Sequence, residues 1–212
     1  MLRIKLTLLT LIISACATVS NSDVILLDSK PINAKNTKIV ENQLNETPID
    51  IWERIRRELT IKIPDDQIAA TSIYRERLYK NQSAVNRISK SGQRYLFHTL
   101  SRAQELDLPV ELALLPFVES EFDPYAKSVD GATGIWQFMP ATGKEWGLKS
   151  NWWYDGKKDV LASTEAALKF LSYLHQKFDE DWLLAMAAYN TGPTRVNSCL
   201  LYTSDAADDR IG

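Results

Sequence analysis

One segment near the carboxyl end of the chain constrains the fold most strongly, because it is apolar on every side. Residues 182–190 read WLLAMAAYN. A helix with a polar face can lie on a surface, whereas a helix that is apolar all round has to be buried among other elements. Its alanines also allow neighbouring helices to approach closely. We therefore expect a central, buried helix surrounded by the rest of the chain.

The other regular patterns in the chain are helical as well. Apolar residues recur every three or four positions in four further segments, which are 51–59, 68–79, 85–106 and 167–178. We expect each stripe to face the core and the stripe in residues 85–106 to lie on one helix. No strand alternation longer than a few residues is present. The predicted fold class is therefore mainly α.

Composition supports one domain with a substantial core and argues against two classes of function. The chain has 212 residues, of which 45% are hydrophobic and six are tryptophan. Its 25 basic and 27 acidic residues nearly cancel, so nucleic acid is not an expected partner. Two cysteines and two histidines form no cluster with metal-ligand spacing. We expect neither a metal nor a cofactor.

The amino terminus has the layout of an export signal. Basic residues precede a short apolar run in residues 6–13, which is too short to span a bilayer as a mature helix. The run ends in Ser14-Ala15-Cys16, which resembles the lipobox of bacterial lipoproteins, where the cysteine is acylated. A plain signal peptide or a short buried helix is the alternative interpretation.

We accordingly predict a signal peptide in residues 1–15, a lipid anchor on Cys16 and a polar, flexible tether in residues 16–48. Ala17 stands where lipoproteins retained in the inner membrane commonly carry Asp. The resemblance therefore implies an outer-membrane lipoprotein that faces the periplasm and contacts the membrane through Cys16.

The segment from Leu112 to Thr142 carries the candidate catalytic group. Glu119 ends an apolar run, and we expect it at the end of a helix that starts near Pro109 and is bent by Pro116 in its interior. A carboxyl group held against apolar neighbours loses solvation of its charged form, so its pKa rises. A carboxyl group that still carries its proton near neutral pH can act as a general acid and donate that proton to a leaving oxygen.

A hydrolase that uses two carboxylates would need a second acid across the scissile bond. Glu121 and Asp123 are nearest in sequence, but their polar, turn-rich surroundings favour a solvated or helix-ending role. Asp130 precedes Gly131 and is typical of a turn. A mechanism with one acid therefore fits the sequence better than a pair.

Two further groups of side chains are candidates for substrate contact. Tyr189 and Asn190 end the buried helix, where a hydroxyl and an amide could hold a catalytic carboxyl or a substrate group. Trp146, Trp152 and Trp153 follow the Glu119 segment, and their aromatic faces could stack on sugar rings. Buried packing is the commoner fate of tryptophan, so both interpretations stay open.

These motifs together resemble the lytic transglycosylase family, whose domain is similar to goose-type lysozyme. The resemblance covers residues 49–196 and depends on four separated motifs in order, together with Ala187-Ala188-Tyr189-Asn190 downstream. The four motifs are Ile51-Trp52, Leu114-Leu115-Pro116, Gly134-Ile135-Trp136-Gln137 and residues 159–164 (DVLAST). The resemblance implies a lysozyme-like transglycosylase domain in residues 105–196, preceded by an N-terminal helical segment in residues 49–104.

The resemblance also implies a reaction. The family cleaves the β-1,4 bond between N-acetylmuramic acid and N-acetylglucosamine in peptidoglycan and leaves 1,6-anhydromuramoyl ends. By this resemblance Glu119 is the acid/base, Ser128 positions the reaction, Gln137 and Met139 line the cleft, and Tyr189 lies near the catalytic carboxyl. A hydrolytic muramidase on the same fold and a non-catalytic peptidoglycan-binding lipoprotein are the alternatives.

Residues 197–212 do not match the family pattern and have no helical stripe. We expect the transglycosylase domain to be incomplete here and this tail to be non-native, for example the product of a sequencing junction.

Overall fold

The computed structural model describes residues 50–208, and the regular structure of this part is helical. In chain order the helices are α3 (Ile51–Glu58), α4 (Asp65–Lys80), α5 (Gln82–Gly92), α6 (Leu96–Glu105), the 3-10 helix η1 (Val110–Leu114), α7 (Leu115–Ser120), α8 (Pro140–Glu145), α9 (Val160–Lys177), α10 (Trp182–Thr191) and α11 (Pro193–Asp208). Strand-like pairing among these residues is limited to isolated bridges. The predicted mainly α class is confirmed.

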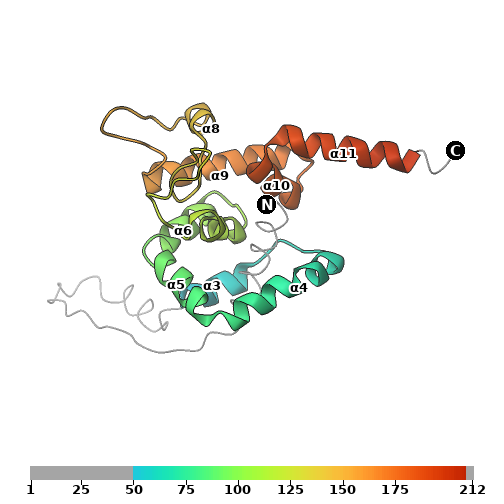
Figure 1. The fold of residues 1–212 in the computed structure, drawn as a ribbon, viewed down its shortest axis with the longest axis horizontal. Coiled ribbons are helices and arrows are strands. Elements are labelled where there is room, and N and C mark those ends of the chain that lie inside the picture. Colours follow the sequence, from blue (N-terminus) through green and yellow to red (C-terminus); the bar gives the residue numbers. More distant parts are fainter. Residues whose placement is uncertain (1–49, 209–212) are drawn as a thin grey trace, which may run out of the picture.

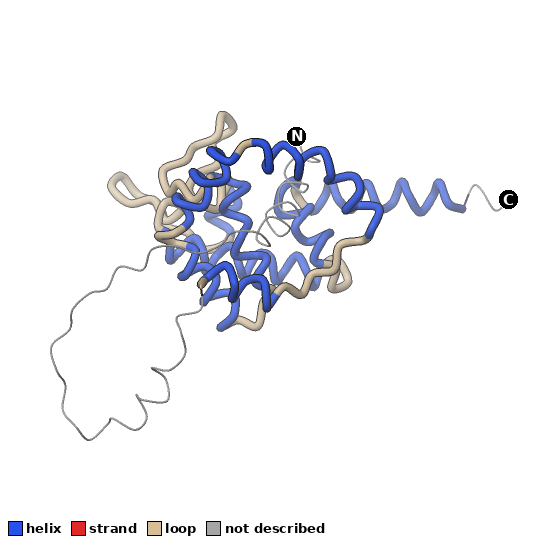
Figure 2. The backbone as a smooth tube through the Cα atoms, turned by 90° about the horizontal axis from the view of Figure 1, so that it is seen from below, coloured by secondary structure: helices blue, strands red, loops and turns tan. Residues whose placement is uncertain are grey.

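The helices form two groups with α6 between them. Helices α3, α4 and α5 lie at one end of the molecule, and α9, α10 and α11 lie at the other (Figure 1). Helix α6 packs on α9 and on η1, and η1 in turn packs on α3, so these contacts join the two groups. Helix α11 extends away from the body in two perpendicular views (Figures 1 and 2).

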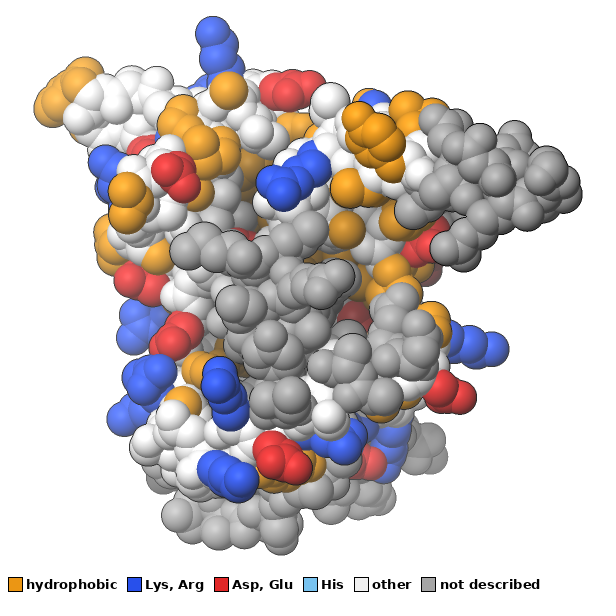
Figure 3. All heavy atoms as spheres, turned by 45° about the vertical axis from the view of Figure 1, so that its right-hand side comes forward, with side chains coloured by type: hydrophobic (Ala, Val, Ile, Leu, Met, Phe, Trp, Pro, Cys, Tyr) orange, Lys and Arg blue, Asp and Glu red, His pale blue; other side chains and the backbone are white. Residues whose placement is uncertain are grey.

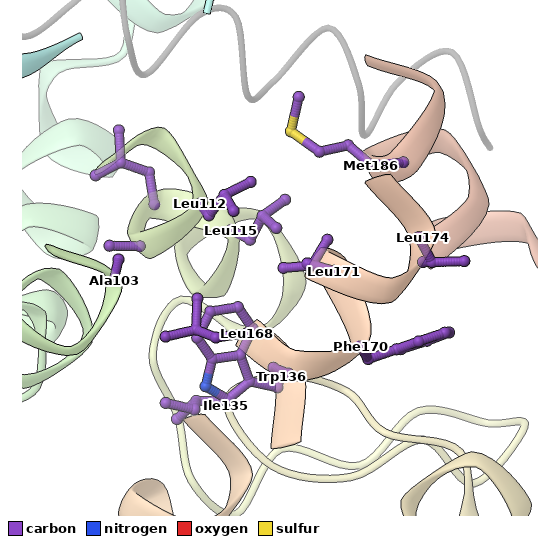
Figure 4. Packing of buried hydrophobic residues seen from close by; sticks show 14 of the residues in the cluster. Ala103, Leu112, Leu115, Ile135, Trp136, Leu168, Phe170, Leu171, Leu174 and Met186 are labelled. Carbon is purple, nitrogen blue, oxygen red and sulfur yellow. The ribbon is translucent and has the colours of Figure 1, made fainter. Parts of the chain in front are cut away.

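The hydrophobic core lies where η1 and α7 face α9 and α10. Leu112 and Leu115 from the first pair of elements approach Leu168 and Leu171 of α9, and Trp136 lies beside them (Figure 4). All five side chains are almost completely buried. The same cluster includes residues of α3 and α6, so the N-terminal helices and the later ones share one core.

The segment that is apolar on every side forms α10, which packs on α9 and α11. Ala185, Met186 and Ala188 are buried, and the remaining apolar residues of the helix are half-buried. The predicted helix is therefore present and contributes to the core. It lies at one end of the described structure (Figure 1) and is only partly buried, so the expectation of a helix surrounded by the rest of the chain is wrong.

The stripe in residues 85–106 was expected on one helix, and the structure shows that this prediction is wrong. The segment is divided into α5 and α6 by a turn at residues 93–95. Gly92 ends α5 and lies against Phe117, because a Cβ atom at Gly92 would be only 2.4 Å from the Phe117 ring. Close packing on α7 at a residue with low helix propensity explains why the chain turns at this point.

The stripe in residues 68–79 was expected to face the core through Ile68 and through either Leu78 or Tyr79, and this prediction is wrong at Ile68. In α4, the side chains of Ile68 and Tyr79 are 41% and 51% exposed. Helix α4 packs on α5 at the edge of the molecule, away from the main core.

Pro116 does not bend the interior of a helix as expected. The chain forms η1 first, and α7 starts afresh at Leu115, so Pro116 lies in the first turn of α7. A proline is tolerated there, because the first amide groups of a helix have no partner within the helix.

The end of the chain also differs from expectation, because α11 continues through Asp208 although no helix was predicted after Val196. Leu201 and Tyr202 are 65% and 77% exposed, so this part of α11 has no buried stripe. The predicted signal peptide, Cys16 and the tether lie outside the described residues. In residues 50–208, no helix is long and apolar enough to cross a membrane.

Candidate active site

Glu119 lies in the last turn of α7, where the buried run reaches the surface. Residues 111–117 are buried, whereas Val118, Glu119 and Ser120 are half-buried. The helix ends at Glu121, which adopts a left-handed conformation and donates its backbone N–H to the carbonyl of Pro116. The short helix and its tight end hold the Glu119 carboxyl at the boundary between core and solvent.

Tyr189 lies within electrostatic range of this carboxyl. Burial raises the pKa of the Tyr189 phenol well above its usual value of 10.0, and the charge on Glu119 raises it further. The phenol donates a hydrogen bond of 2.8 Å to the backbone carbonyl of Trp136. Tyr189 therefore remains a neutral hydroxyl group beside Glu119.

A loop formed by residues 126–138 faces the end of α7. Thr133 and Phe138 exchange two backbone hydrogen bonds, and the Ser128 N–H donates to the carbonyl of Ala132. The hydroxyl of Ser120 in α7 donates to the carbonyl of Ile135 at 2.9 Å, which connects the helix to the loop.

Two of the predicted site residues also have roles inside this loop. Ser128 is half-buried, and its Oγ atom accepts the N–H of Ala132 at 3.0 Å. The Gln137 amide nitrogen donates to the carbonyl oxygens of Gly134 at 3.0 Å and Ala126 at 3.3 Å. The Gln137 side chain thus closes the turn, a structural role that the sequence analysis missed.

Trp136 anchors the loop to the core. Its indole is fully buried, and Nε1 donates a 2.9 Å hydrogen bond to the hydroxyl of Thr164 in α9. Gly134 lies against the backbone of Lys157, where a Cβ atom would be 1.8 Å from the Lys157 carbonyl oxygen. Only glycine fits there, and its φ of +83° is also one that favours glycine.

The other two predicted site residues lie at helix ends. Met139 precedes α8, and its side chain is 42% exposed. Asn190 is half-buried in α10, and its amide nitrogen donates to the carbonyl of Met186 at 3.1 Å. The Asn190 Oδ1 atom is buried and accepts no hydrogen bond from any described residue.

The acids nearest to Glu119 in sequence have other roles. Glu121 forms a two-pronged ion pair with Arg87 of α5, with N–O distances of 3.0 and 3.1 Å. One Asp123 oxygen accepts the backbone N–H of Tyr125. Asp130 is exposed in a turn. These positions agree with the predicted surface, helix-end and turn roles of the three acids.

Glu111 is a buried acid that the sequence analysis did not single out. Its side chain has no exposed surface, and Oε1 accepts the backbone N–H groups of Thr60 and Ile61, both at 2.6 Å. A charged residue inside the apolar run VELALLPF was the signal that could have identified it. Glu111 connects η1, and thereby α7, to the chain that follows α3.

The three tryptophans that follow the Glu119 segment have different environments. Trp146 packs against Phe170 and Tyr173, with ring centroids 4.9 and 5.6 Å apart. Trp152 and Trp153 are 94% and 70% exposed. The structure thus assigns Trp146 to packing and leaves the other two available for contact with a ligand.

An open pocket of about 630 Å³ lies apart from the predicted site. It is lined by the α3–α4 and α6–η1 connections together with His175 and Trp182, whose rings stack 3.8 Å apart. None of its lining residues was predicted to bind substrate. Among residues 50–208, no three His, Cys, Asp or Glu side chains lie together as metal ligands would.

Comparison with known proteins places this geometry in a family. The family described as the transglycosylase SLT domain matches residues 97–211. This match continues beyond Val196, where we expected the resemblance to end. Membrane-bound lytic murein transglycosylase D of Escherichia coli is 40% identical over 147 residues, which are 69% of this chain and 32% of that enzyme.

Two other relatives are shorter matches. An Alteromonas protein named for tributyltin chloride resistance is 44% identical over 108 residues, which are 51% of this chain and 52% of the relative. Soluble lytic murein transglycosylase of Salmonella typhimurium is 30% identical over 112 residues, which are 50% of this chain and 17% of the relative. This chain therefore spans about a third of the Escherichia coli enzyme, and it belongs to the transglycosylase SLT domain family.

Proposed function

We propose that this chain is a lytic transglycosylase that cleaves the β-1,4 bond between N-acetylmuramic acid and N-acetylglucosamine in peptidoglycan. The observation that carries the proposal is the placement of Glu119 at the solvent boundary of α7, within range of the neutral Tyr189 hydroxyl. The names of the Escherichia coli and Salmonella relatives describe the same activity.

In the proposed reaction, Glu119 first acts as a general acid. It donates its proton to the glycosidic oxygen as the bond from that oxygen to C1 of the muramoyl sugar breaks. The carbonyl oxygen of the substrate's own N-acetyl group supplies the electron pair to C1. The Glu119 carboxylate then takes the proton of the C6 hydroxyl, whose oxygen attacks C1. This attack breaks the bond between C1 and the N-acetyl oxygen, restores the acetamide and closes the 1,6-anhydro ring. No water molecule is consumed.

Other residues would support this step. Tyr189 holds the Trp136 carbonyl and keeps the loop of residues 126–138 beside Glu119. We propose that Ser128, Gln137, Met139 and Asn190 line the path of the glycan. The buried Oδ1 of Asn190 is an acceptor with no partner among the described residues, which makes it a candidate acceptor for a substrate hydroxyl or amide group if the side chain turns toward the glycan.

Incubation with purified peptidoglycan sacculi tests the reaction, with mass spectrometry of the released fragments. The wild-type chain should release muropeptides with 1,6-anhydro ends. Glu119→Gln should lower the rate by about 10²–10⁴-fold, since the proton donor is lost. Glu121→Gln is the matched control, because Glu121 pairs with Arg87 at the surface and should keep near-normal activity.

The products separate the alternatives. Fragments heavier by one water would mean that the protein is a muramidase and that the anhydro mechanism is wrong. A folded wild-type chain that binds sacculi without cleaving them would support the binding lipoprotein instead.

We also propose that the chain resides in the cell envelope, attached to the outer membrane through a lipid on Cys16. The layout of residues 1–16 and the membrane-bound Escherichia coli relative support this location. Metabolic labelling with a fatty-acid analogue should mark the wild-type chain and leave Cys16→Ser unlabelled. Equal labelling of both proteins would contradict the proposal.

A further inference from the structure

The connection between α8 and α9 displays two indole rings to solvent. Trp152 is 94% exposed and Trp153 is 70% exposed, whereas Trp136 is fully buried. In Figure 1 this connection extends away from the body beside α8, and Figure 3 shows hydrophobic side chains at the end of the same lobe. Burial of an aromatic side chain removes about 150–250 Å² of its surface from water. Two adjacent indoles that stay exposed therefore contribute little of this hydrophobic stabilisation to the fold.

The backbone that carries the two rings is held in one conformation. The Asn151 Oδ1 atom accepts the N–H groups of Trp153 at 3.0 Å and Tyr154 at 2.8 Å. The Asn151 N–H in turn donates to the carbonyl of Tyr154 at 2.7 Å. The Ser150 hydroxyl donates to Asp155, which also pairs with Lys157 at 2.7 Å. A ligand that binds here would therefore meet rings on an ordered turn, which lowers the entropy cost of binding.

The base of this turn is packed directly on the candidate active site. The carbonyl of Lys157 occupies the space where a side chain of Gly134 would lie, and Gly134 belongs to the loop of residues 126–138. The hydroxyl of Tyr154 donates to Asp159, the residue that caps α9, at 3.0 Å. The connection that carries the tryptophan pair is thus packed on the loop of residues 126–138, which is itself joined to α7 by the hydrogen bond from Ser120 to the Ile135 carbonyl.

We propose that Trp152 and Trp153 form an accessory glycan-binding platform, on which sugar rings of a peptidoglycan strand stack while another part of the strand occupies the site at Glu119. This inference rests on the proposed function. The C–H groups on one face of a pyranose ring match the apolar face of an indole, and the neighbouring Asn151 and Asp155 offer polar atoms to the hydroxyl groups of the sugar.

The polar neighbours also favour a sugar over a lipid bilayer as the ligand. Insertion of the two indoles into a membrane would draw the amide of Asn151 and the carboxylate of Asp155 toward an apolar phase. Both groups are needed to hold the turn, and removal of a charge from water is costly. A glycan strand keeps these groups hydrated.

Binding can be measured without turnover in the full chain that carries Glu119→Gln and Cys16→Ser. Two assays measure binding. In the first, peptide-free glycan strands prepared from sacculi are titrated into the protein. In the second, the fraction of the protein that co-sediments with intact sacculi is measured. Trp152→Ala combined with Trp153→Ala should weaken binding about tenfold, and each single substitution should have a smaller effect. Phe97→Ala is the matched control, because Phe97 is an aromatic residue that is 63% exposed on α6.

Thermal unfolding should be nearly unchanged in the double variant, since neither indole is buried. Glycan binding that equals that of the parent protein would overturn the proposal. Unchanged glycan binding with reduced sedimentation on phosphatidylglycerol vesicles would overturn it in favour of a membrane contact.

The outcomes distinguish this platform from the proposed catalysis. If wild-type protein does not cleave sacculi but the double variant still loses glycan binding, the platform stands and the proposed activity fails. If wild-type protein cleaves and the double variant binds normally, the activity stands and the platform fails.

Discussion

The phenol of Tyr189 in α10 donates a 2.8 Å hydrogen bond to the backbone carbonyl of Trp136, 53 residues earlier in the chain. This bond ties the end of α10 to the loop that faces Glu119. On its other side, the Trp136 indole donates to Thr164 of α9. The position of the loop is therefore determined by two helices that follow it in sequence.

Replacement of Tyr189 by Phe should destabilise the protein by about 1–3 kcal/mol, because the buried Trp136 carbonyl loses its donor. The ring itself would keep its contacts with Phe138 and Phe170. Urea unfolding measures the loss, and Tyr173→Phe is the control at an exposed position of α9. Equal stability of the Tyr189→Phe variant and the wild type would show that the hydrogen bond contributes nothing.

Replacement of Gly134 by Ala should cost about 3 kcal/mol or more, since the new Cβ atom would clash with the Lys157 carbonyl in a conformation already strained for alanine. Gly131→Ala is the matched control. Gly131 has a similar φ of +89° but open space around it, so alanine there should cost only about 1–2 kcal/mol. Thermal unfolding of the two variants compares them, and equal losses would contradict the close contact at Gly134.

Replacement of Glu111 by Ala should destabilise the protein by about 2–4 kcal/mol, because it leaves a cavity and removes the acceptor of two backbone N–H groups. Glu111→Gln keeps an acceptor oxygen for Thr60 and Ile61 and should lose clearly less. Hydrogen exchange of the Thr60 and Ile61 amides gives a local readout. If these amides remain protected in Glu111→Ala, the carboxyl is not what holds this connection.

The Arg102–Glu165 ion pair between α6 and α9 should make stability depend on acid pH. The hydrogen bond from Arg102 lowers the pKa of Glu165 to about 2 from its usual 4.5. A carboxyl with a depressed pKa stabilises the fold above pH 4.5, and this stability is lost as the pH falls toward 2. Both side chains are about a third exposed, at 30% and 34%, so the effect should not exceed about 1 kcal/mol.

Urea unfolding of the wild type and Glu165→Gln checks this dependence. The free energy of unfolding should be higher for the wild type than for Glu165→Gln at pH 7, and the two values should become equal near pH 2. Glu105→Gln, which removes the more exposed partner of Arg102, should show a smaller difference at pH 7. If the free energies of unfolding of the wild type and Glu165→Gln differ by the same amount at both pH values, the stabilisation does not come from the ionised carboxylate of Glu165.

The sequence by itself determined the helical class, the helix at residues 182–190 and the place of Glu119 at the end of an apolar run. These features depend on the spacing of apolar residues within one element, and that spacing is local. Family motifs added the expected reaction in the same way, through short stretches that can be recognised without knowledge of what they touch.

Only the tertiary structure decided how those elements meet. The stripe in residues 85–106 reads as one helix until Gly92 is seen against Phe117, and Glu111 gains a role only when Thr60 and Ile61 lie beside it. Trp146 and Trp152 cannot be distinguished by type, yet one packs against Phe170 and the other is exposed. Each difference depends on contacts between residues far apart in the chain, which local periodicity does not encode.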